Sequence, residues 1–423
     1  MTDLVARHLV WHPFTQHALE GAMREIVDAE GAWLIAKDGQ RIFDAISSWW
    51  VVTHGHGHPK IIAAIQEQAG KLDQVIFAGF THEPAEQVAR QLLAFAPDGL
   101  SHVFFSDSGS TSVEVALKMA LGFWRNRGEA RTRILALEHA YHGDTIGTMS
   151  AGARGVFNAA YEPLLFDVGR IPFPAAGQQQ LTLDALEAEC RSGNIAALIV
   201  EPLILGAGGM LIYDAATLAE MRRICAEHNV LFIADEVMTG FGRTGAMFAC
   251  DLAGIEPDIL CLAKGLTGGS LPLAATLCRT EIFEAHYSTD RAKTFFHSSS
   301  YTANPICCAA AAANLEIWRS ERNSDRLVEL AAAHVPFLVK LADDGGFKNI
   351  RQIGTIAALD LNVADKGYLA DVALTMRKAF LKRGVLLRPL GNTIYIMPPY
   401  CTTSAELSAV YAAISEVADE VRV

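Results

Sequence analysis

The sequence predicts an α/β protein, with a large domain on a mostly parallel β-sheet and a smaller α+β domain. Short apolar runs alternate with helical patterns from about residue 100 onward. Turn residues bound each run, as expected for strands that are buried on both faces of a sheet. The last hundred residues lose this regular alternation, and a length of 423 residues is typical of two or three domains.

The predicted elements follow in chain order. WLIAKDGQRIFDAI predicts a hairpin within an N-terminal segment, 1–49, that belongs to the small domain. The large domain, 50–325, contains the buried strands HVFF, ILAL, AALIVEP, VLFIADE, ILCLAK and LAATLC, with amphipathic helices between them. In the C-terminal small domain, 326–423, RQIGTIAALDLN and GNTIYIMPP predict strands, whereas VALTMRKAFLKRG and SAELSAVYAAISEVADEV predict helices.

Composition and charge exclude several classes of protein. Half the residues (51%) are hydrophobic, which excludes a disordered chain, and the net charge of −12 without a basic tract argues against binding nucleic acid. Glu201 and Pro202 interrupt the most apolar stretch, so we expect no membrane span. The eight cysteines form no C-x-x-C pair and several lie in apolar runs, so we expect reduced thiols in a cytoplasmic protein. His54, His56 and His58 alternate, but no acidic or cysteine partner is nearby, and we predict no metal.

Three loops at the predicted carboxyl edge of the sheet carry groups that can bind a ligand. Residues 106–111, SDSGST, lie between a strand and a helix, where free amides and hydroxyls can hold an anion. Asp235 and Glu236 end another strand, and Lys264 ends a third, each before a glycine-rich loop. Taken singly, the first loop is better explained by ordinary helix capping. The other two are as consistent with a structural ion pair and with a lysine that reaches the surface as with function.

Together the three loops supply the groups that pyridoxal phosphate needs. The helix terminus would hold the phosphate, Asp235 would keep the pyridine nitrogen protonated, and Lys264 would hold the aldehyde carbon as a Schiff base. Burial lowers the pKa of a lysine, which frees its amine for this attack. The sequence therefore predicts a pyridoxal phosphate enzyme.

The same segments resemble a known family. LFIADEVMTGFGRTGAMFA and PDILCLAKGLTGG are similar to the signature of the class III aminotransferases, which are fold-type I pyridoxal phosphate enzymes. WHPFT, SSWWVVTHGHGHP, SDSGSTSVEVALKMA, YHGDTIGTMS and LLRPLGNTIYIMPPY resemble its biotin-biosynthesis branch, and the similarity runs from about residue 8 to the C-terminus. The resemblance implies a seven-stranded sheet, a homodimer that shares its active site across the interface, and amino transfer from S-adenosylmethionine to 8-amino-7-oxononanoate, giving 7,8-diaminononanoate.

The resemblance also implies roles for individual residues around the cofactor. Lys264 would bind the cofactor and shuttle a proton, Asp235 would pair with the pyridine nitrogen, and Tyr141 would stack on the ring and contact substrate. Gly109 and Ser110 would form the phosphate cradle.

A serine-rich stretch would complete the cradle from the neighbouring subunit. The resemblance implies that the segment with Ser299 and Ser300 crosses the dimer interface to the neighbour's phosphate, and that Ser298 contacts substrate. Many relatives read H-G-P-T where this chain reads HSSS, so the contacts of Ser298 and Ser299 stay open.

The resemblance implies a set of substrate-binding residues as well. Arg388 would bind the acceptor's carboxylate through two parallel hydrogen bonds from its planar guanidinium, and Arg243 would bind a second carboxylate. Trp49 and Trp50 would line the pocket, where aromatic walls suit an aliphatic chain and a sulfonium cation. Phe14 stands where relatives commonly have tyrosine, so it would pack against substrate without offering a hydrogen bond.

Other functions stay open at this stage. The nearest alternative is another class III aminotransferase of the ω-amino acid:pyruvate type, and a second is lysine as amino donor. A nucleotide-binding oxidoreductase is disfavoured because no dinucleotide fingerprint is present, and a non-catalytic binding protein because Lys264 and Asp235 are both in place.

Overall fold

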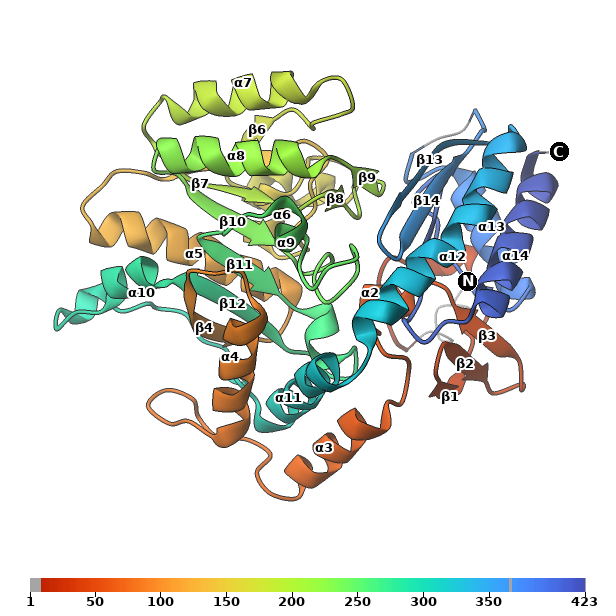
Figure 1. Cartoon of the computed structure of the whole chain (residues 1–423), viewed down its shortest axis with the longest axis horizontal. Coiled ribbons are helices and arrows are strands. Elements are labelled where there is room, and N and C mark those ends of the chain that lie inside the picture. The colour runs from red at the N-terminus through yellow and green to blue at the C-terminus, as the bar shows by residue number, and fades with distance from the viewer. Residues whose placement is uncertain (1–8, 365–366, 423) are drawn as a thin grey trace.

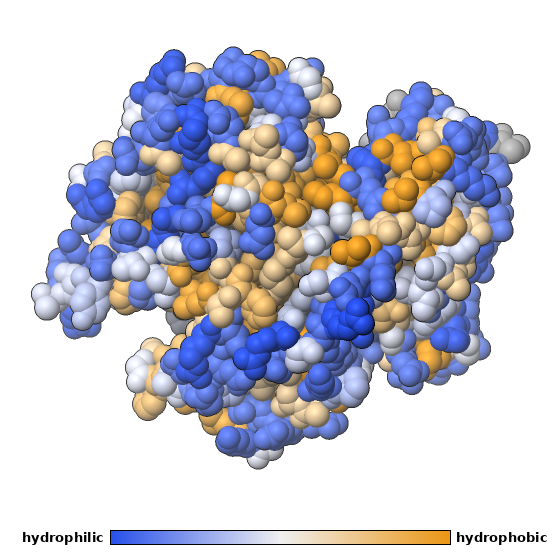
Figure 2. Space-filling model, in the orientation of Figure 1, coloured by the Kyte–Doolittle hydropathy of each residue, from blue (hydrophilic) through white to orange (hydrophobic). Residues whose placement is uncertain are grey.

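The computed structural model describes residues 9–364 and 367–422, so the part of the predicted N-terminal segment before residue 9 lies outside the described residues. The molecule has two lobes, with the large sheet in one and both termini of the described chain in the other (Figure 1). Figure 2 shows a notch between the lobes, with hydrophobic residues on both of its sides.

A seven-stranded sheet forms the centre of the large lobe, in the order β4-β12-β11-β10-β7-β5-β6. β12 runs antiparallel to both of its neighbours, and the other pairs are parallel. This arrangement confirms the predicted fold class. The strands are β4 Leu100–Ser106, β5 Arg133–Leu137, β6 Gly169–Ile171, β7 Ile195–Val200, β10 Leu231–Asp235, β11 Ile259–Leu262 and β12 Ala274–Arg279.

Helices cover both faces of this sheet, so its strands are buried on both sides (Figure 1). Along β10, Leu231 and Ile233 join the apolar core under α5 (Gly109–Asn126). Phe232 and Ala234, which point the other way, join the core that includes α8 (Ala215–Glu227). The remaining large-lobe helices and strands are α3 Pro59–Ala69, α4 Glu83–Phe95, α6 Ile146–Ala151, α7 Gln179–Cys190, β8 Ile204–Leu205, β9 Leu211–Ile212, α9 Ala249–Ala253, α10 Thr280–His286 and α11 Pro305–Ser320.

The small lobe combines the two ends of the chain. The predicted hairpin forms from β2 (Trp33–Ala36) and β3 (Arg41–Asp44), and β3 then pairs in parallel with β15 (Val385–Leu386). This pairing joins the N-terminal strands to the C-terminal region. The other elements are β1 Ile26–Glu30, α2 Ser47–Trp50, α12 Asn323–Asp343, β13 Phe347–Ile353, β14 Ile356–Leu361, α13 Asp371–Lys382, β16 Thr393–Ile396 and α14 Ser404–Arg422; short 3₁₀ turns are η1 His17–Leu19, η2 Ala159–Leu164, η3 Lys264–Thr267 and η4 Arg291–Lys293.

Candidate active site

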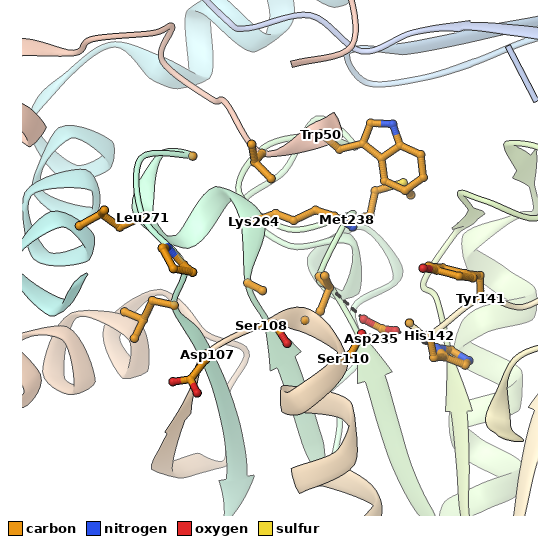
Figure 3. A pocket seen from close by; sticks show the side chains of 18 of the residues that line it. Trp50, Asp107, Ser108, Ser110, Tyr141, His142, Asp235, Met238, Lys264 and Leu271 are labelled. Carbon is orange, nitrogen blue, oxygen red and sulfur yellow. Dashed lines mark hydrogen bonds and ion pairs between the residues drawn. The ribbon is translucent and has the colours of Figure 1, made fainter. Parts of the chain in front are cut away.

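A cavity of about 460 Å³ lies at the carboxyl edge of the large sheet, where the three predicted loops converge. The start of α5 contributes Gly109 and Ser110, the end of β10 contributes Asp235, and the turn after β11 contributes Lys264. Tyr141 comes from the loop after β5. Figure 3 shows the Lys264 side chain extending toward Trp50, with Asp235 below it and Tyr141 to one side.

The start of α5 has the properties of an anion cradle. Ser108 caps the helix, and its side chain accepts a hydrogen bond from the amide of Thr111. The amides of Gly109 and Ser110 bond no other residue in the described chain, which leaves them at the positive end of the helix. A β-carbon at Gly109 would lie 2.5 Å from Val237 Cγ1, so only glycine keeps this approach open.

Asp235 is held by a hydrogen-bond network at the end of β10. Its Oδ2 lies 2.7 Å from Nδ1 of His142, and its Oδ1 accepts the amide of Val237 at 3.2 Å. Both side chains are buried, and Nε2 of His142 has no partner among the described residues. The contact of His142 with Asp235 was not predicted, although His142 directly follows Tyr141 in the chain.

Lys264 occupies a strained and shielded position. Its φ is +40°, in the left-handed region that residues other than glycine rarely adopt. Removal of the amine from water lowers the pKa of Lys264 to about 8, although Asp235 and Glu201 nearby act in the opposite direction. Its Nζ lies 4.7 Å from the centre of the Trp50 ring. The amine is thus partly neutral near physiological pH, as a nucleophile and proton carrier must be.

Tyr141 is positioned by Glu201, a buried carboxylate at the end of β7 that the sequence analysis did not assign to the site. Glu201 accepts the amides of Tyr141 and Gly206, each at 2.9 Å, and burial raises its own pKa to about 7. Burial and then Asp144 raise the pKa of Tyr141 well above its usual range, so its phenol stays protonated. The signal in the sequence was a carboxylate at the end of an apolar strand, as for Asp235.

A second cavity, of about 310 Å³, opens beside the first and is lined mainly by aromatic rings, which we call the aromatic pocket. Phe14 lies 5.5 Å from Trp49 and 5.9 Å from Phe157, and Phe157 lies 4.4 Å from Tyr368, all between ring centres. Phe157 and Tyr368 were not predicted, because they lie on irregular segments without a motif. The pocket is lined by Phe14, Trp49, Trp50, Tyr141, Asp144, Phe157, Ala207, Lys264, Tyr368 and Leu390.

Arg388 lies at the rim of this pocket rather than in its wall. One η-nitrogen donates to the carbonyl of Phe14 at 2.8 Å, and the guanidinium lies 4.8 Å from the centre of the Trp49 ring. No other hydrogen bond from Arg388 to a described residue is found, so its other donors stay available to an anion.

Trp49 and Trp50 project from a left-handed turn. Ser47, Ser48, Trp49 and Trp50 have φ values of +51°, +46°, +72° and +74°. Asp44 holds the turn, because its carboxylate accepts the amide and hydroxyl of Ser48 at 2.9 and 2.7 Å. Trp50 is fixed further by a hydrogen bond of 3.1 Å from its indole to Tyr395 Oη.

Arg243 is not brought into either cavity. It is 1% exposed, and its guanidinium donates to the carbonyls of Pro398, Val52 and Trp50 at 3.0, 2.7 and 3.3 Å. These bonds direct the guanidinium toward the backbone behind the Trp50 segment. The expectation that it handles a substrate carboxylate therefore finds no support in this geometry, because its donors are already engaged.

The serine stretch also stays outside the cavities within a single chain. The hydroxyl of Ser299 donates to Asp107, which lines the first cavity, and the carbonyl of Ser300 accepts a bond of 2.7 Å from Gln74. Ser298 is exposed and bonds only to Ser299 among the described residues. The predicted contacts across a dimer interface stay a prediction.

No cluster of three or more histidine, cysteine, aspartate or glutamate side chains able to hold a metal was found among residues 9–364 and 367–422. Within the same ranges, no helix has the length and apolar character needed to cross a membrane.

The residues of the first cavity fit pyridoxal phosphate. A side chain at residue 143 would fill the cradle, because a β-carbon there would lie 2.1 Å from Ser110 Oγ, and Gly143 has φ +129°. The cavity also offers an anion cradle, a hydrogen-bonded buried carboxylate and a partly neutral lysine. Fold and site together define a fold-type I pyridoxal phosphate enzyme.

Comparison with known proteins agrees with this class. The family model "Aminotransferase class-III" matches residues 16–418. Adenosylmethionine-8-amino-7-oxononanoate aminotransferases from Synechococcus elongatus and Mycobacterium leprae are 48% and 40% identical to this chain, over 97% and 98% of it and 99% and 95% of their own lengths. The chain belongs to the class III aminotransferase family and is a pyridoxal phosphate-dependent transaminase.

Solved structures show the same fold. The adenosylmethionine-8-amino-7-oxononanoate aminotransferase of Methanocaldococcus jannaschii superposes with a TM-score of 0.93 at 33% identity, covering 99% of both chains. An amine transaminase from an uncultivated Pseudomonas species, solved in its pyridoxal phosphate-bound form, gives a TM-score of 0.92 at 32% identity, covering 98% of this chain and 99% of the other.

Proposed function

We propose that this transaminase transfers an amino group from S-adenosylmethionine to 8-amino-7-oxononanoate, giving 7,8-diaminononanoate in biotin biosynthesis. The observation that carries the proposal is the aromatic pocket beside Lys264, with Asp144 in its wall and Arg388 at its rim. Such a pocket suits both a nine-carbon chain that ends in a carboxylate and a donor that carries a sulfonium cation. The names of the relatives support the same substrates.

The cofactor, when bound, supplies an electron sink that stabilises negative charge on the carbon next to the amino nitrogen. Gly109 and Ser110 would hold its phosphate, Asp235 its pyridine nitrogen, and Tyr141 the face of its ring. Lys264 would anchor it covalently.

The chain's own groups then act in two half-reactions. Lys264 Nζ accepts the proton that leaves the amino-bearing carbon of the donor and returns a proton during the second half-reaction. His142 holds Asp235 in place, and Arg388 orients the keto acid through its carboxylate. The donor leaves before the acceptor binds, so one pocket serves both.

We further propose a cytoplasmic homodimer in which Ser299 and Ser300 approach the phosphate of the neighbouring subunit. Large apolar side chains near this stretch support the dimer, because Phe296, Tyr301, Ile76 and Phe80 are each more than 60% exposed. All eight cysteines are free thiols, the state that a reducing compartment maintains.

Product analysis tests this function. Purified enzyme loaded with pyridoxal phosphate is incubated with 8-amino-7-oxononanoate and either S-adenosylmethionine or lysine, and 7,8-diaminononanoate is measured by mass spectrometry. We expect product with S-adenosylmethionine. A parallel incubation replaces the keto acid with pyruvate. Efficient amination of pyruvate there, with no 7,8-diaminononanoate in the first incubation, would instead indicate an ω-amino acid transaminase.

A further inference from the structure

Asn314 is a buried polar residue that lines neither cavity and has no part in the steps above. It lies on α11, and its side chain is fully buried. Its Nδ2 donates hydrogen bonds to the carbonyl oxygens of Gly265 and Leu266, at 2.9 and 3.0 Å. These two residues directly follow Lys264 in the chain, so the amide of Asn314 holds the turn that carries the lysine.

We propose that Asn314 is a positioning residue for Lys264. Its two hydrogen bonds hold the strained turn after β11, and through the turn they set the direction from which the lysine amine approaches the cofactor's aldehyde. The inference concerns the attachment of pyridoxal phosphate, so it does not depend on which amino donor or keto acid the enzyme uses.

The turn after β11 needs support from outside itself. Lys264 has a φ of +40°, and Gly268 and Gly269 follow at +67° and +91°. The left-handed conformation is unfavourable for lysine, because its β-carbon crowds the following carbonyl oxygen. A residue keeps such a conformation only where the surrounding structure determines it by several contacts.

Asn314 supplies contacts that the backbone of the turn does not. The carbonyl of Gly265 also accepts the amide of Gly268, at 3.0 Å, but the carbonyl of Leu266 accepts no main-chain hydrogen bond from the described residues. Leu266 is fully buried, so its carbonyl would lack a partner away from water if the Asn314 amide were removed. Bonds from one amide to two successive carbonyls also fix the orientation of both peptide groups.

Close packing restricts the turn as well. A β-carbon at Gly265 would lie 2.9 Å from Cβ of Phe241, so the chain passes close to Phe241 at this point. A β-carbon at Gly268 would lie 3.1 Å from Oδ1 of Asn314. The Asn314 side chain therefore lies against both Gly265 and Gly268, and the turn between them has little room to change direction.

A positioning role differs from a purely structural one in what it affects. Attachment of the cofactor joins Lys264 Nζ to the aldehyde carbon and releases one water, and its rate depends on the alignment of the two atoms. Noncovalent binding of the cofactor's phosphate and ring depends instead on Gly109, Ser110 and Asp235. Loss of the Asn314 amide should therefore slow attachment without weakening noncovalent binding.

Two ligands separate these roles. Pyridoxal phosphate can bond to Lys264, whereas pyridoxine 5′-phosphate has an alcohol in place of the aldehyde and binds only noncovalently. Asn314→Leu keeps the approximate size of the side chain and removes both donors. In stopped-flow absorbance above pH 8, it should slow the attachment of pyridoxal phosphate to cofactor-free protein about tenfold or more, and the calorimetric dissociation constant of pyridoxine 5′-phosphate should stay within about twofold of wild type.

Asn323→Leu is the matched control. Asn323 is also a buried asparagine that lines neither cavity, and its Nδ2 donates to the carbonyl of Ile317 at 2.9 Å. The control should lower the thermal midpoint as Asn314→Leu does, yet keep the attachment rate within about twofold of wild type. Asn314→Ser and Asn323→Ser repeat the comparison with a smaller side chain in case leucine prevents folding.

Slower attachment with unchanged binding of pyridoxine 5′-phosphate supports the inference, whichever donor the enzyme uses. An attachment rate within about twofold of wild type in a folded Asn314 variant would overturn it. An equal loss of affinity for pyridoxine 5′-phosphate, or equal slowing in the Asn323 control, would overturn it too, because either result would indicate a general loosening of the structure.

Discussion

At the scale of single residues, the chemistry depends on a lysine whose amine is partly neutral near pH 7. Burial lowers the pKa of Lys264 to about 8, while the carboxylates of Asp235 and Glu201 favour the charged form. With this pKa, about a tenth of the amine is neutral at pH 7, against a few parts in ten thousand for an ordinary lysine. The protein therefore keeps a usable nucleophile near neutral pH.

Cofactor capture should consequently depend on pH. The rate at which cofactor-free protein attaches pyridoxal phosphate should rise with pH, because deprotonation of Lys264 produces the attacking amine, and the midpoint should lie at about 8. Stopped-flow absorbance measures this rate. A midpoint near 10.5, the ordinary value for lysine, would show that the amine is not shielded.

Arg388→Ala should impair the second half-reaction selectively. A charge-assisted bidentate bond contributes about 1.5–3 kcal/mol, so the catalytic efficiency with 8-amino-7-oxononanoate should fall about ten- to 150-fold. Absorbance titration with pyridoxal phosphate should show little change in cofactor binding. Unchanged kinetics with the keto acid would mean that another cation binds its carboxylate.

Residues at strand ends were predictable, whereas their supporting contacts were not. Asp235 and Lys264 each end an apolar run, and this local pattern alone places them at the edge of the sheet. His142 contacts Asp235, which lies 93 positions later in the sequence. Phe157 contacts Tyr368, and the separation of these two residues in the sequence is longer still. Such contacts depend on the path of loops, which no local periodicity encodes. Arg243 is the opposite case, because its place in the sequence suggested a role in substrate binding, whereas its guanidinium donates to the carbonyls of Pro398 and Val52.

At the scale of elements, the left-handed turn Ser47–Trp50 is the least expected feature. Each non-glycine residue in this conformation costs about 1–2 kcal/mol, so the surrounding structure must stabilise it. Asp44 bonds Ser48 twice and lies 2.9 Å from Nε2 of His56. The sequence analysis read His56 as part of a histidine loop, and the turn itself has no sequence signature, because its residues are not those that favour positive φ.

Asp44→Ala should destabilise the protein and distort the aromatic pocket. Removing a fully buried carboxylate that holds these three groups should cost about 3–5 kcal/mol, and each kcal/mol should lower the thermal midpoint of a chain of this length by about 1 °C. Differential scanning calorimetry measures the shift, with Asp28→Ala on exposed β1 as the matched control. An unchanged midpoint for Asp44→Ala would show that other contacts hold the turn.

At the scale of the whole molecule, sequence patterning anticipated the two lobes and the mostly parallel sheet. Continuous apolar runs identified the sheet strands because such strands are buried on both faces, as Leu231–Asp235 is. The antiparallel direction of β12 was beyond prediction, because an apolar run does not reveal which way its strand runs. The aromatic pocket was also beyond prediction, since it combines side chains from both lobes.

The exposed apolar side chains near the serine stretch lead to a prediction about assembly. Light scattering coupled to gel filtration should give twice the chain mass of 45.7 kDa. Phe296→Asp should lower this mass toward one chain and weaken cofactor binding, because a charge replaces an exposed apolar contact and the partner's serines are lost from the cradle. A wild-type protein of one chain mass that retains full activity would contradict the shared site.

The central claim is that one pocket beside Lys264 takes an amino group from S-adenosylmethionine and passes it to the keto acid. The direct measurement is an absorbance-monitored pair of half-reactions with enzyme in its pyridoxal phosphate form. S-adenosylmethionine should convert the bound cofactor to its pyridoxamine form, and 8-amino-7-oxononanoate should then reverse the change. In Lys264→Ala, both half-reactions should be slower than in wild type by more than about 10²-fold. Conversion by other amines but not by S-adenosylmethionine, or reversal by pyruvate but not by the keto acid, would contradict the claim.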